Sequence, residues 1–356
     1  MANFDDFKLA IEALSGGKNT IILDDREMPS VVVPFPRLKM SDLITSGSQN
    51  YHPAFSVGGA EKNRIMVSKF INVVLNDRAY SLPLKDPRTS VNFDQAVQYC
   101  RNKGKGWSLM PYSLWCAIAL WCKKNETMPR GNNSWGHDHA YTHEVGTPTA
   151  YETGDSHKGE PTRTATGSGP NTWNHNWMPD GIADLNGNVW EWCAGMRLKD
   201  GEIQIIPYAN CMQAEISMGA DSSEWKALDK DGNTVAPGSD GTLKWDWVSS
   251  KLQLTNKAVT YTTDQGNGGQ YKDMTLVSGL DAAPELAKAL LLYPDQPGED
   301  VYGGDYHWAN TRGERLPICG GLWNSTGDAG VFRVSLYYPR TYANGSIGFR
   351  SAFCEL

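Results

Sequence analysis

The sequence predicts an α+β fold with small antiparallel sheets, two helices, many loops and one long insertion. Three observations lead to this prediction. Two segments have helical periodicity, several short segments alternate apolar and polar residues with the period of two typical of strands, and 36 Gly, 13 Trp and 15 Tyr residues supply many turns and rings. A chain of 356 residues is long enough for a large core.

The N-terminal residues 1–50 differ from the rest of the chain. Residues 5–14 predict a short helix that ends at a Gly pair, and an extended run containing Pro34 and Pro36 follows. The acidic start lacks the basic stretch and apolar core of a secretory signal. We interpret residues 1–50 as an attachment or oligomerisation segment, with a disordered leader as the alternative, and residues 51–356 as the ligand-binding domain.

The two core helices are predicted early in this domain. In residues 92–101, apolar side chains recur at i, i+3, i+4 and i+7 from Phe93 onwards. Residues 113–122 are apolar on nearly all sides, which is typical of a buried helix. Strands are predicted over residues 65–75 and 79–82.

The middle of the chain is less regular. Residues 126–180 are polar and lack periodicity, which indicates a functional or covering loop. A turn at Asn186 and Gly187 precedes a strand over residues 189–192. Residues 200–315 are predicted to be an insertion, with strands over 202–206, 243–248 and 259–263 and a helix over 283–292.

The C-terminal residues 316–353 carry the most informative pattern. Phe332, Val334 and Leu336 alternate with polar residues, which predicts a strand with one face buried and one face in water. Rings and guanidinium groups are enriched at recognition surfaces. The side chains of this kind predicted to face water are Arg333, Tyr337, Tyr338, Arg340 and Tyr342.

The same region has an unusual composition. Lys, Glu, Gln and Met together account for 54 residues of the chain, so a window of 37 residues is expected to hold about five or six of them. Residues 317–353 hold none. A Gly-rich strand region also disfavours Lys and Glu, which is the simpler explanation.

The motif GGLWNSTGDAGVFRVSLYYPR, followed by IGFRSAF, resembles the variable region of the target proteins of diversity-generating retroelements. In that family a reverse transcriptase changes codons at adenines, and the resulting NNC codons cannot encode Lys, Glu, Gln, Met or Trp. Trp323 matches a fixed position of the family motif. The resemblance implies that the varied, ligand-binding positions are Leu322, Asn324, Ser325, Asp328, Arg333, Ser335, Tyr337, Tyr338, Tyr342, Asn344 and Ser346.

Further motifs indicate the fold. GWSLMPYSLWCAIALWC and DLNGNVWEW, together with GGLW and GFR, resemble the C-type-lectin-like fold of the formylglycine-generating-enzyme (sulfatase-modifying factor) type. The resemblance implies this fold for residues 51–356. It also implies a binding protein that recognises a host surface molecule, carried on a phage tail or, alternatively, on a bacterial surface.

The alternative function is that of a metal-dependent oxidase or sulfoxide synthase of the same superfamily. Formylglycine-generating enzymes hold copper with two thiolates, but Ser325 and Gly330 stand at the matching positions. Sulfoxide synthases bind iron through an HxxxHxE motif. His139 and His143 have the right interval, but Val145 stands where the Glu is needed. We therefore expect no catalytic residue.

The only metal that the resemblance implies for this chain is a structural calcium ion, held by Asp184 and Glu191 with the carbonyls of Gly187 and Val189. The alternative is that Asp184 caps a turn and Glu191 pairs with an arginine such as Arg350. No other cofactor is expected.

Charge and composition limit the partners. A net charge of −7 and a pI near 5.5 argue against nucleic acid, and no apolar run approaches the ~20 residues that cross a bilayer. Seven cysteines without CxxC spacing indicate free thiols in a reducing cytoplasm. The expected partner is a surface protein or glycan, bound by a homo-oligomer such as a trimer. The expected location is a phage virion assembled in the host cytoplasm.

Overall fold

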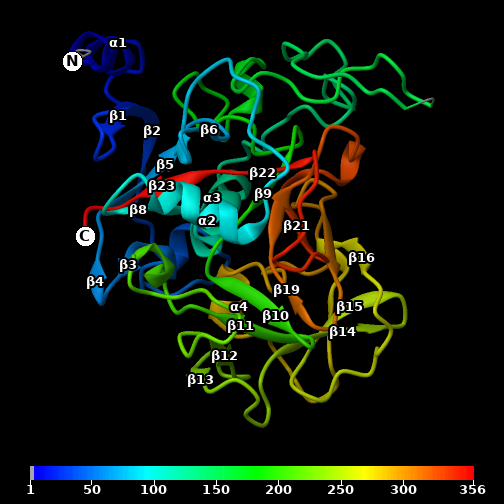
Figure 1. The fold of residues 1–356 in the computed structure, drawn as a ribbon. Coiled ribbons are helices and arrows are strands. Elements are labelled where there is room, and N and C mark those ends of the chain that lie inside the picture. Colours follow the sequence, from blue (N-terminus) through cyan, green and yellow to red (C-terminus); the bar gives the residue numbers. More distant parts are fainter. Residues whose placement is uncertain (1–3, 155) are drawn as a thin grey trace.

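The computed structural model describes residues 4–154 and 156–356. These residues form three main sheets and four helices, and the sheets are small and mostly antiparallel (Figure 1). The predicted α+β class is therefore confirmed. The helices are α1 (Asp5–Leu14), α2 (Phe93–Arg101), α3 (Tyr112–Lys124) and α4 (Glu285–Ala289). The two predicted core helices correspond to α2 and α3.

The first sheet joins the two ends of the chain. Its antiparallel strands lie in the order β1 (Thr20–Leu23), β2 (Pro29–Pro36), β5 (Arg64–Ser68), β23 (Ser351–Phe353) and β8 (Trp107–Leu109). Val33 and Phe35 of β2 are buried in the same apolar cluster as α3. Residues 20–36 thus share the sheet and core of the following residues. The attachment or oligomerisation role of this segment stays a prediction.

The second sheet contains the C-terminal strand on which the sequence motifs concentrate. Its strands lie in the order β16 (Asn267–Gln270), β18 (Tyr306–Ala309), β21 (Gly330–Leu336), β20 (Ile318–Gly320), β9 (Trp190–Trp192) and β22 (Ile347–Phe349). β21 is an interior strand that pairs in parallel with β18 and antiparallel with β20. Two strands of the predicted insertion therefore extend this sheet.

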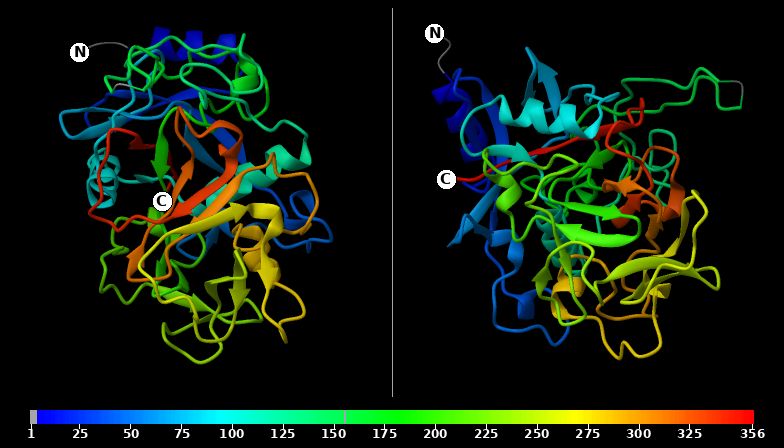
Figure 2. Two further views of the ribbon diagram at one scale, coloured as in Figure 1. Left: turned by 90° about the vertical axis from the view of Figure 1, so that its right-hand side faces the viewer. Right: turned by 60° about the horizontal axis from the view of Figure 1, so that its bottom comes forward.

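The third sheet belongs largely to the insertion. It contains β13 (Thr234–Val235), β12 (Lys226–Leu228), β11 (Glu202–Ile205), β14 (Lys244–Val248), β15 (Lys251–Thr255) and β17 (Thr275–Leu276), with β10 (Met196–Lys199) beside β11 and β19 (Glu314–Arg315). Two small hairpins complete the strands: β3 (Ser56–Val57) with β4 (Ala60–Glu61), and β6 (Val73–Leu75) with β7 (Arg78–Tyr80). Figures 1 and 2 place α1 and the β14–β15 hairpin at opposite ends of the molecule.

Some predicted strands differ from the structure. The strand predicted over residues 65–75 is divided between β5 and β6, and residues 259–263 form no strand. The Asp246 carboxylate explains the second difference, because it accepts hydrogen bonds from the backbone N–H groups of Thr260 and Tyr261 at 2.8 and 3.0 Å. These donors are therefore not available to a neighbouring strand.

The helix α3 lies in the core and holds β21. Its side chains are buried along nearly the whole helix, as its apolar sequence predicted. The Trp115 indole N–H donates to the carbonyl oxygen of Val331 in β21 at 2.8 Å. A buried backbone acceptor is satisfied in this way, and the start of β21 is attached to the helix.

The irregular segment 126–180 covers the turn that precedes β21. The Trp135 N–H donates to the Trp323 carbonyl at 2.7 Å, and the Thr326 N–H donates to the Asn133 carbonyl at 2.8 Å. These contacts show that the segment covers residues 323–326, which is one of the two roles that the sequence predicted for it.

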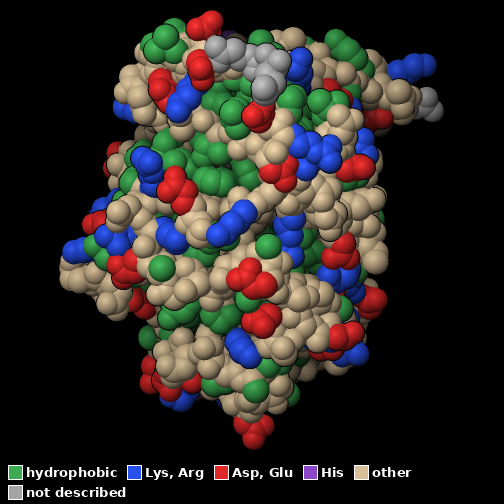
Figure 3. All heavy atoms as spheres, turned by 60° about the vertical axis from the view of Figure 1, so that its left-hand side comes forward, with side chains coloured by type: hydrophobic (Ala, Val, Ile, Leu, Met, Phe, Trp, Pro, Cys, Tyr) green, Lys and Arg blue, Asp and Glu red, His purple; other side chains and the backbone are tan. Residues whose placement is uncertain are grey.

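Charge and hydropathy give two further results. On the face drawn in Figure 3, Lys and Arg side chains lie interspersed with Asp and Glu. Among the described residues, no helix combines the length and the apolar character needed to span a membrane.

Candidate ligand-binding site

A cavity of about 400 Å³ lies at the end of β21. Five of the predicted varied positions line it: Leu322, Arg333, Ser335, Tyr337 and Tyr338. The remaining lining residues are Trp190, Gln265, Gly266 and Trp308. The structure therefore brings part of the predicted set together in one concave site. Cavities of this volume accommodate small ligands or single groups of larger ones.

One prediction about this site is wrong. Arg333 and Ser335 were expected to face water, but they are 8% and 5% exposed, and every residue of β21 is buried. The reason is that β21 has neighbouring strands on both sides and that residues 265–266 and 308 of the insertion border the cavity above it. The alternation of apolar and polar residues separates a core face from a cavity face.

The guanidinium of Arg333 lies among aromatic rings. Its Cζ atom is 5.2 Å from the ring centroid of Trp190 and 5.9 Å from that of Tyr306, distances at which a cation is attracted to a ring face. Nη1 forms an ion pair with Asp328 Oδ2 at 3.2 Å. Burial lowers the pKa of Arg333, and the Asp328 carboxylate opposes that shift.

Three tyrosines extend from the cavity to the surface. The rings of Tyr337 and Tyr338 meet edge to face at 4.8 Å, and those of Tyr338 and Tyr342 stack at 3.9 Å. Burial raises the pKa of Tyr338 to about 12, so this hydroxyl keeps its proton near neutral pH. Tyr337 is 40% exposed and forms the outer part of the cavity wall.

The other predicted positions lie outside the cavity lining. Ser325 is buried, and its hydroxyl accepts from the Leu322 N–H at 3.1 Å, so it stabilises the turn. Asn344 accepts from the Ser346 N–H at 2.8 Å within an outer loop. Asn324 is exposed. Asp328 and Tyr342 each contact a residue of the lining: Asp328 forms the ion pair with Arg333, and Tyr342 stacks on Tyr338.

Arg340 also differs from its predicted role. Its guanidinium donates to Glu314, to Asp94 and to the carbonyl of Met218. Because all three guanidinium nitrogens have partners, Arg340 anchors the segment after β21 and does not face water freely.

The core side of β21 agrees with the prediction. Phe332, Val334 and Leu336 are all fully buried. Phe332 packs against the rings of Tyr271 and Tyr302, with centroid distances of 5.7 and 5.1 Å. These contacts hold the strand independently of the side chains on the cavity face.

Four cavity residues were not predicted as site residues. Trp190 belongs to the DLNGNVWEW motif, which indicated the fold and not the site, whereas this residue is 7% exposed and lines the cavity. Gln265, Gly266 and Trp308 lie in the insertion. The Gly-rich run QGNGGQ and the ring of Trp308 were the available signals, but no local pattern relates them to β21, which lies far away in sequence.

The proposed calcium ligands have other partners. Both carboxylate oxygens of Glu191 accept from Arg350, at 2.9 and 2.8 Å, which is the ion pair weighed as the alternative. Asp184 accepts from the Gly167 N–H at 2.7 Å, and burial raises the pKa of Asp184 to about 6. This arrangement does not fit Glu191 as a calcium ligand, because both of its oxygens already contact a cation.

Gly330, which matches a copper-ligand position, and the thiols and the glutamate nearest to the two catalytic motifs lie buried or have protein partners. A Cβ atom at Gly330 would lie 2.2 Å from Asp305 Oδ2, so no thiolate fits there. Cys319 lies on β20 and Cys354 follows β23, in a different sheet, and both are buried. In the histidine segment, Glu144 accepts hydrogen bonds from Arg130 and Thr172 at 2.5 and 2.8 Å.

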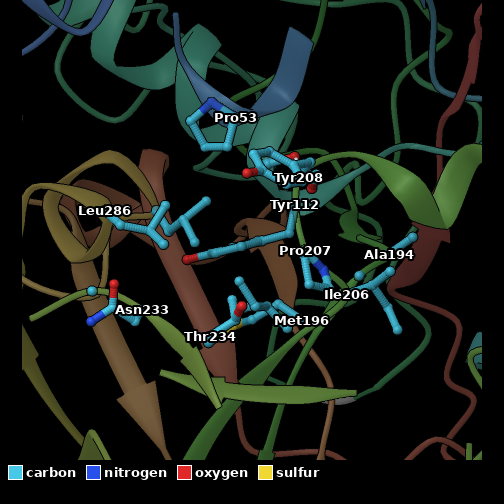
Figure 4. Close-up of a pocket in the computed structure, with 15 residues that line it drawn as sticks. Pro53, Tyr112, Ala194, Met196, Ile206, Pro207, Tyr208, Asn233, Thr234 and Leu286 are labelled. Carbon is cyan, nitrogen blue, oxygen red and sulfur yellow. Dashed lines mark hydrogen bonds between the residues drawn. The ribbon is translucent and has the colours of Figure 1, made fainter. Parts of the chain in front are cut away.

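A second cavity, of about 420 Å³, is drawn in Figure 4. It lies between the start of α3, the strands β10 and β11, and residues 286 and 290 at α4. Its lining is mostly apolar and includes Tyr112, Met196, Ile206 and Leu286. Because it contains none of the predicted positions, the cavity at β21 is the better candidate for the site.

Comparisons with known proteins give the following results. No protein-family model and no curated protein matches the sequence. The chain is similar to the solved structure of Treponema denticola variable protein 1, at 13% identity and a TM-score of 0.35, over 94% of this chain and 98% of that one. It is also similar to the Major Tropism Determinant P3c variant (11% identity, TM-score 0.32, 94% and 71% of the chains). A third similar structure is PvdO from Pseudomonas aeruginosa (10%, 0.32, 94% and 97%).

At such TM-scores the likenesses carry no functional argument, and the fold class follows from the strand order and helices of the chain itself.

Proposed function

We propose that this chain is a ligand-binding protein that presents the cavity at the end of β21 to an external molecule, and that a retroelement diversifies its cavity residues. One observation carries the proposal. Five predicted varied positions line one cavity, while the alternate residues Phe332, Val334 and Leu336 lie in the core. A substitution on the cavity face therefore changes what is bound and leaves the core contacts of Phe332, Val334 and Leu336 in place.

Rigid surroundings favour binding at such a site. The Trp115 hydrogen bond holds the backbone of Val331, and the covering loop holds the backbone of Trp323. Groups that are already ordered lose little entropy when the ligand binds. Tyrosine and tryptophan rings provide contact area with few rotatable bonds.

The test combines three cavity residues. Replacing Leu322, Tyr337 and Tyr338 with other residues that NNC codons encode should abolish binding to cells that carry the ligand on their surface. The melting temperature should fall by only a few degrees. The matched control replaces exposed residues elsewhere, Leu84, Tyr151 and Tyr208. Loss of folding in the cavity variant, or unchanged cell binding, would contradict the proposal.

The retroelement part has its own test in the surrounding DNA. We expect a reverse-transcriptase frame and a near-copy of the segment that encodes residues 316–353, differing mainly at adenines. DNA without either feature would contradict diversification but would not contradict the binding function of the cavity.

We further infer that the ligand is a host surface molecule, protein or glycan, and that the chain is a tail component of a phage virion. A homo-oligomer such as a trimer would turn weak single contacts into avidity. Antibodies against the chain should label virion tails, and sedimentation should show an oligomer. A monomer at micromolar concentration would contradict the oligomer.

The proposal includes no catalytic step. Metal analysis of the purified protein distinguishes the proposed binding function from the alternative function. Stoichiometric copper or iron would favour an oxidase or sulfoxide synthase.

A further inference from the structure

Arg333 differs from the two other arginines that stabilise the C-terminal region. Arg350 uses all three guanidinium nitrogens in hydrogen bonds to protein groups, and so does Arg340. In Arg333, by contrast, Nε is buried without a hydrogen-bond acceptor in the described part of the chain, and Nη1 has only the ion pair with Asp328 at 3.2 Å. A buried donor without an acceptor costs about 1–3 kcal/mol, so an acceptor that enters the cavity would stabilise this guanidinium.

The cavity around Arg333 has one formal charge. Of its nine lining residues, Arg333 alone is charged. Asp328, its ion-pair partner, is not a lining residue, and its side chain is 42% exposed. Water therefore screens the carboxylate more than it screens the guanidinium, whose side chain is 10% exposed. An entering group therefore meets the guanidinium as the one charged side chain of the lining.

The walls of the cavity favour a flat, ring-shaped ligand. Trp190, Trp308, Tyr337 and Tyr338 surround the guanidinium with aromatic surface. The indole nitrogen of Trp308 is a further buried donor that has no partner among the described residues. The volume of about 400 Å³ admits a single sugar ring, whose faces can pack on the aromatic walls and whose hydroxyl oxygens can accept from the indole N–H.

We propose that the cavity of this chain binds one sugar ring that carries an anionic group, a carboxylate or a sulfate ester, with the anionic group at Arg333 and the ring between the aromatic walls. This proposal rests on the proposed binding function and names the chemical class of its ligand. Charge-assisted hydrogen bonds from a guanidinium fork to such an oxyanion are among the strongest in proteins.

The experiment measures binding to the full-length protein by calorimetry with matched probes. Methyl β-glucuronide and glucose 6-sulfate are each compared with methyl β-glucoside, which has the same ring without the charge. We expect one of the charged probes to bind at least about tenfold more tightly than the neutral one. The stronger of the two identifies the anionic group.

Two variants test the role of Arg333. Arg333→Gln should weaken binding of the charged probe at least about tenfold. Asp328→Asn should strengthen it, because the competing carboxylate is removed and the cavity gains net positive charge. The second variant keeps the proposal testable if Arg333→Gln fails to fold. Arg163→Gln is the control, because Arg163 pairs with Asp86 at the surface and outside the cavity.

Equal binding of charged and neutral probes, or weaker binding by Asp328→Asn, would overturn the acidic-sugar proposal. So would tighter binding of a Glu-containing peptide than of either charged sugar. If no sugar binds but cell binding is lost in the Tyr337→Ala variant, the binding function stands and this inference fails. If charged sugars bind to Tyr337→Ala and to Arg333→Gln as tightly as to the unsubstituted protein, the cavity is not the site and both proposals fail.

Discussion

Single residues of the C-terminal region show how buried charge is used. Arg350 and Glu191 are 0% and 1% exposed, and two hydrogen bonds join them. Arg350 also donates to the carbonyl groups of Ser68, Lys69 and Ala183. This side chain therefore ties together the first sheet, the turn before β9 and the C-terminal strands.

Replacing Arg350 should be strongly destabilising. Arg350→Met leaves Glu191 as a buried unpaired charge, so we expect the free energy of unfolding to fall by about 3–5 kcal/mol in urea titrations. Arg163→Met, at a half-exposed ion pair with Asp86, should change it by less than about 1 kcal/mol. Similar losses in the two variants would show that the Arg350 network is not the link between these elements.

Asp184 should make stability depend on pH. Burial raises the pKa of Asp184 to about 6, so the folded state binds this proton more tightly than the unfolded state does. Ionisation therefore destabilises the fold as pH rises from about 4 to about 6. Asp184→Asn should raise the free energy of unfolding by roughly 3 kcal/mol near pH 7 and leave it unchanged near pH 4.

The same variant tests the calcium prediction. If calcium binds at Asp184, Asp184→Asn should lower stability near neutral pH, and EDTA should lower the melting temperature of the unsubstituted protein. The ion pair of Glu191 with Arg350 leads us to expect no effect of EDTA.

At the scale of elements, β21 separates stability from binding along one strand. Leu336 is fully buried, and the next residue, Tyr337, is 40% exposed. Leu336→Ala should lower the free energy of unfolding by about 2–5 kcal/mol, and Tyr337→Ala by less than about 1 kcal/mol. Chemical unfolding of the two variants checks this expectation. Equal losses of unfolding free energy would place Tyr337 in the core. They would contradict the proposal that the cavity face tolerates substitutions.

The insertion shapes the cavity through Gly266. A Cβ atom at this position would lie 2.2 Å from the ring of Tyr337, which is 40% exposed and would have to shift. Gly266→Ala should therefore weaken binding of the charged sugar probe with little change in melting temperature. Gly345→Ala, where a Cβ atom meets nothing within 4 Å, is the control. Unchanged affinity in Gly266→Ala would show that the insertion does not limit the cavity.

At the scale of the whole molecule, the N-terminal segment is part of the main fold. β2 pairs with β5, and Val33 and Phe35 enter the central core. α1 lies outside this core, and its Phe7 and Ile11 pack against a small cluster around Ile21. The first 50 residues thus combine a peripheral helix with an interior strand.

Two truncations test this division. Removing residues 1–17 should leave cooperative thermal unfolding, with a modest loss in melting temperature. Removing residues 1–50 should prevent folding, because β5 loses its neighbour and the core loses several buried side chains. Cooperative unfolding of the longer truncation would support the separate segment that the sequence predicted.

The sequence by itself determined the helices α2 and α3, the α+β class and the core face of β21. These features follow from periodicity, which the backbone geometry of helices and strands imposes locally. Asn92, for example, caps α2 by accepting from the Gln95 N–H at 2.9 Å, a contact between residues three positions apart.

Only the tertiary structure decided what covers the other face of β21. Arg333 and Ser335 are polar and alternate with apolar residues, so their local pattern is the same whether water or another segment lies above them. Residues 190, 265–266 and 308 close the cavity from far away in the chain. Such coverage depends on strand order and on the path of the insertion, and the pattern of a single strand does not encode either.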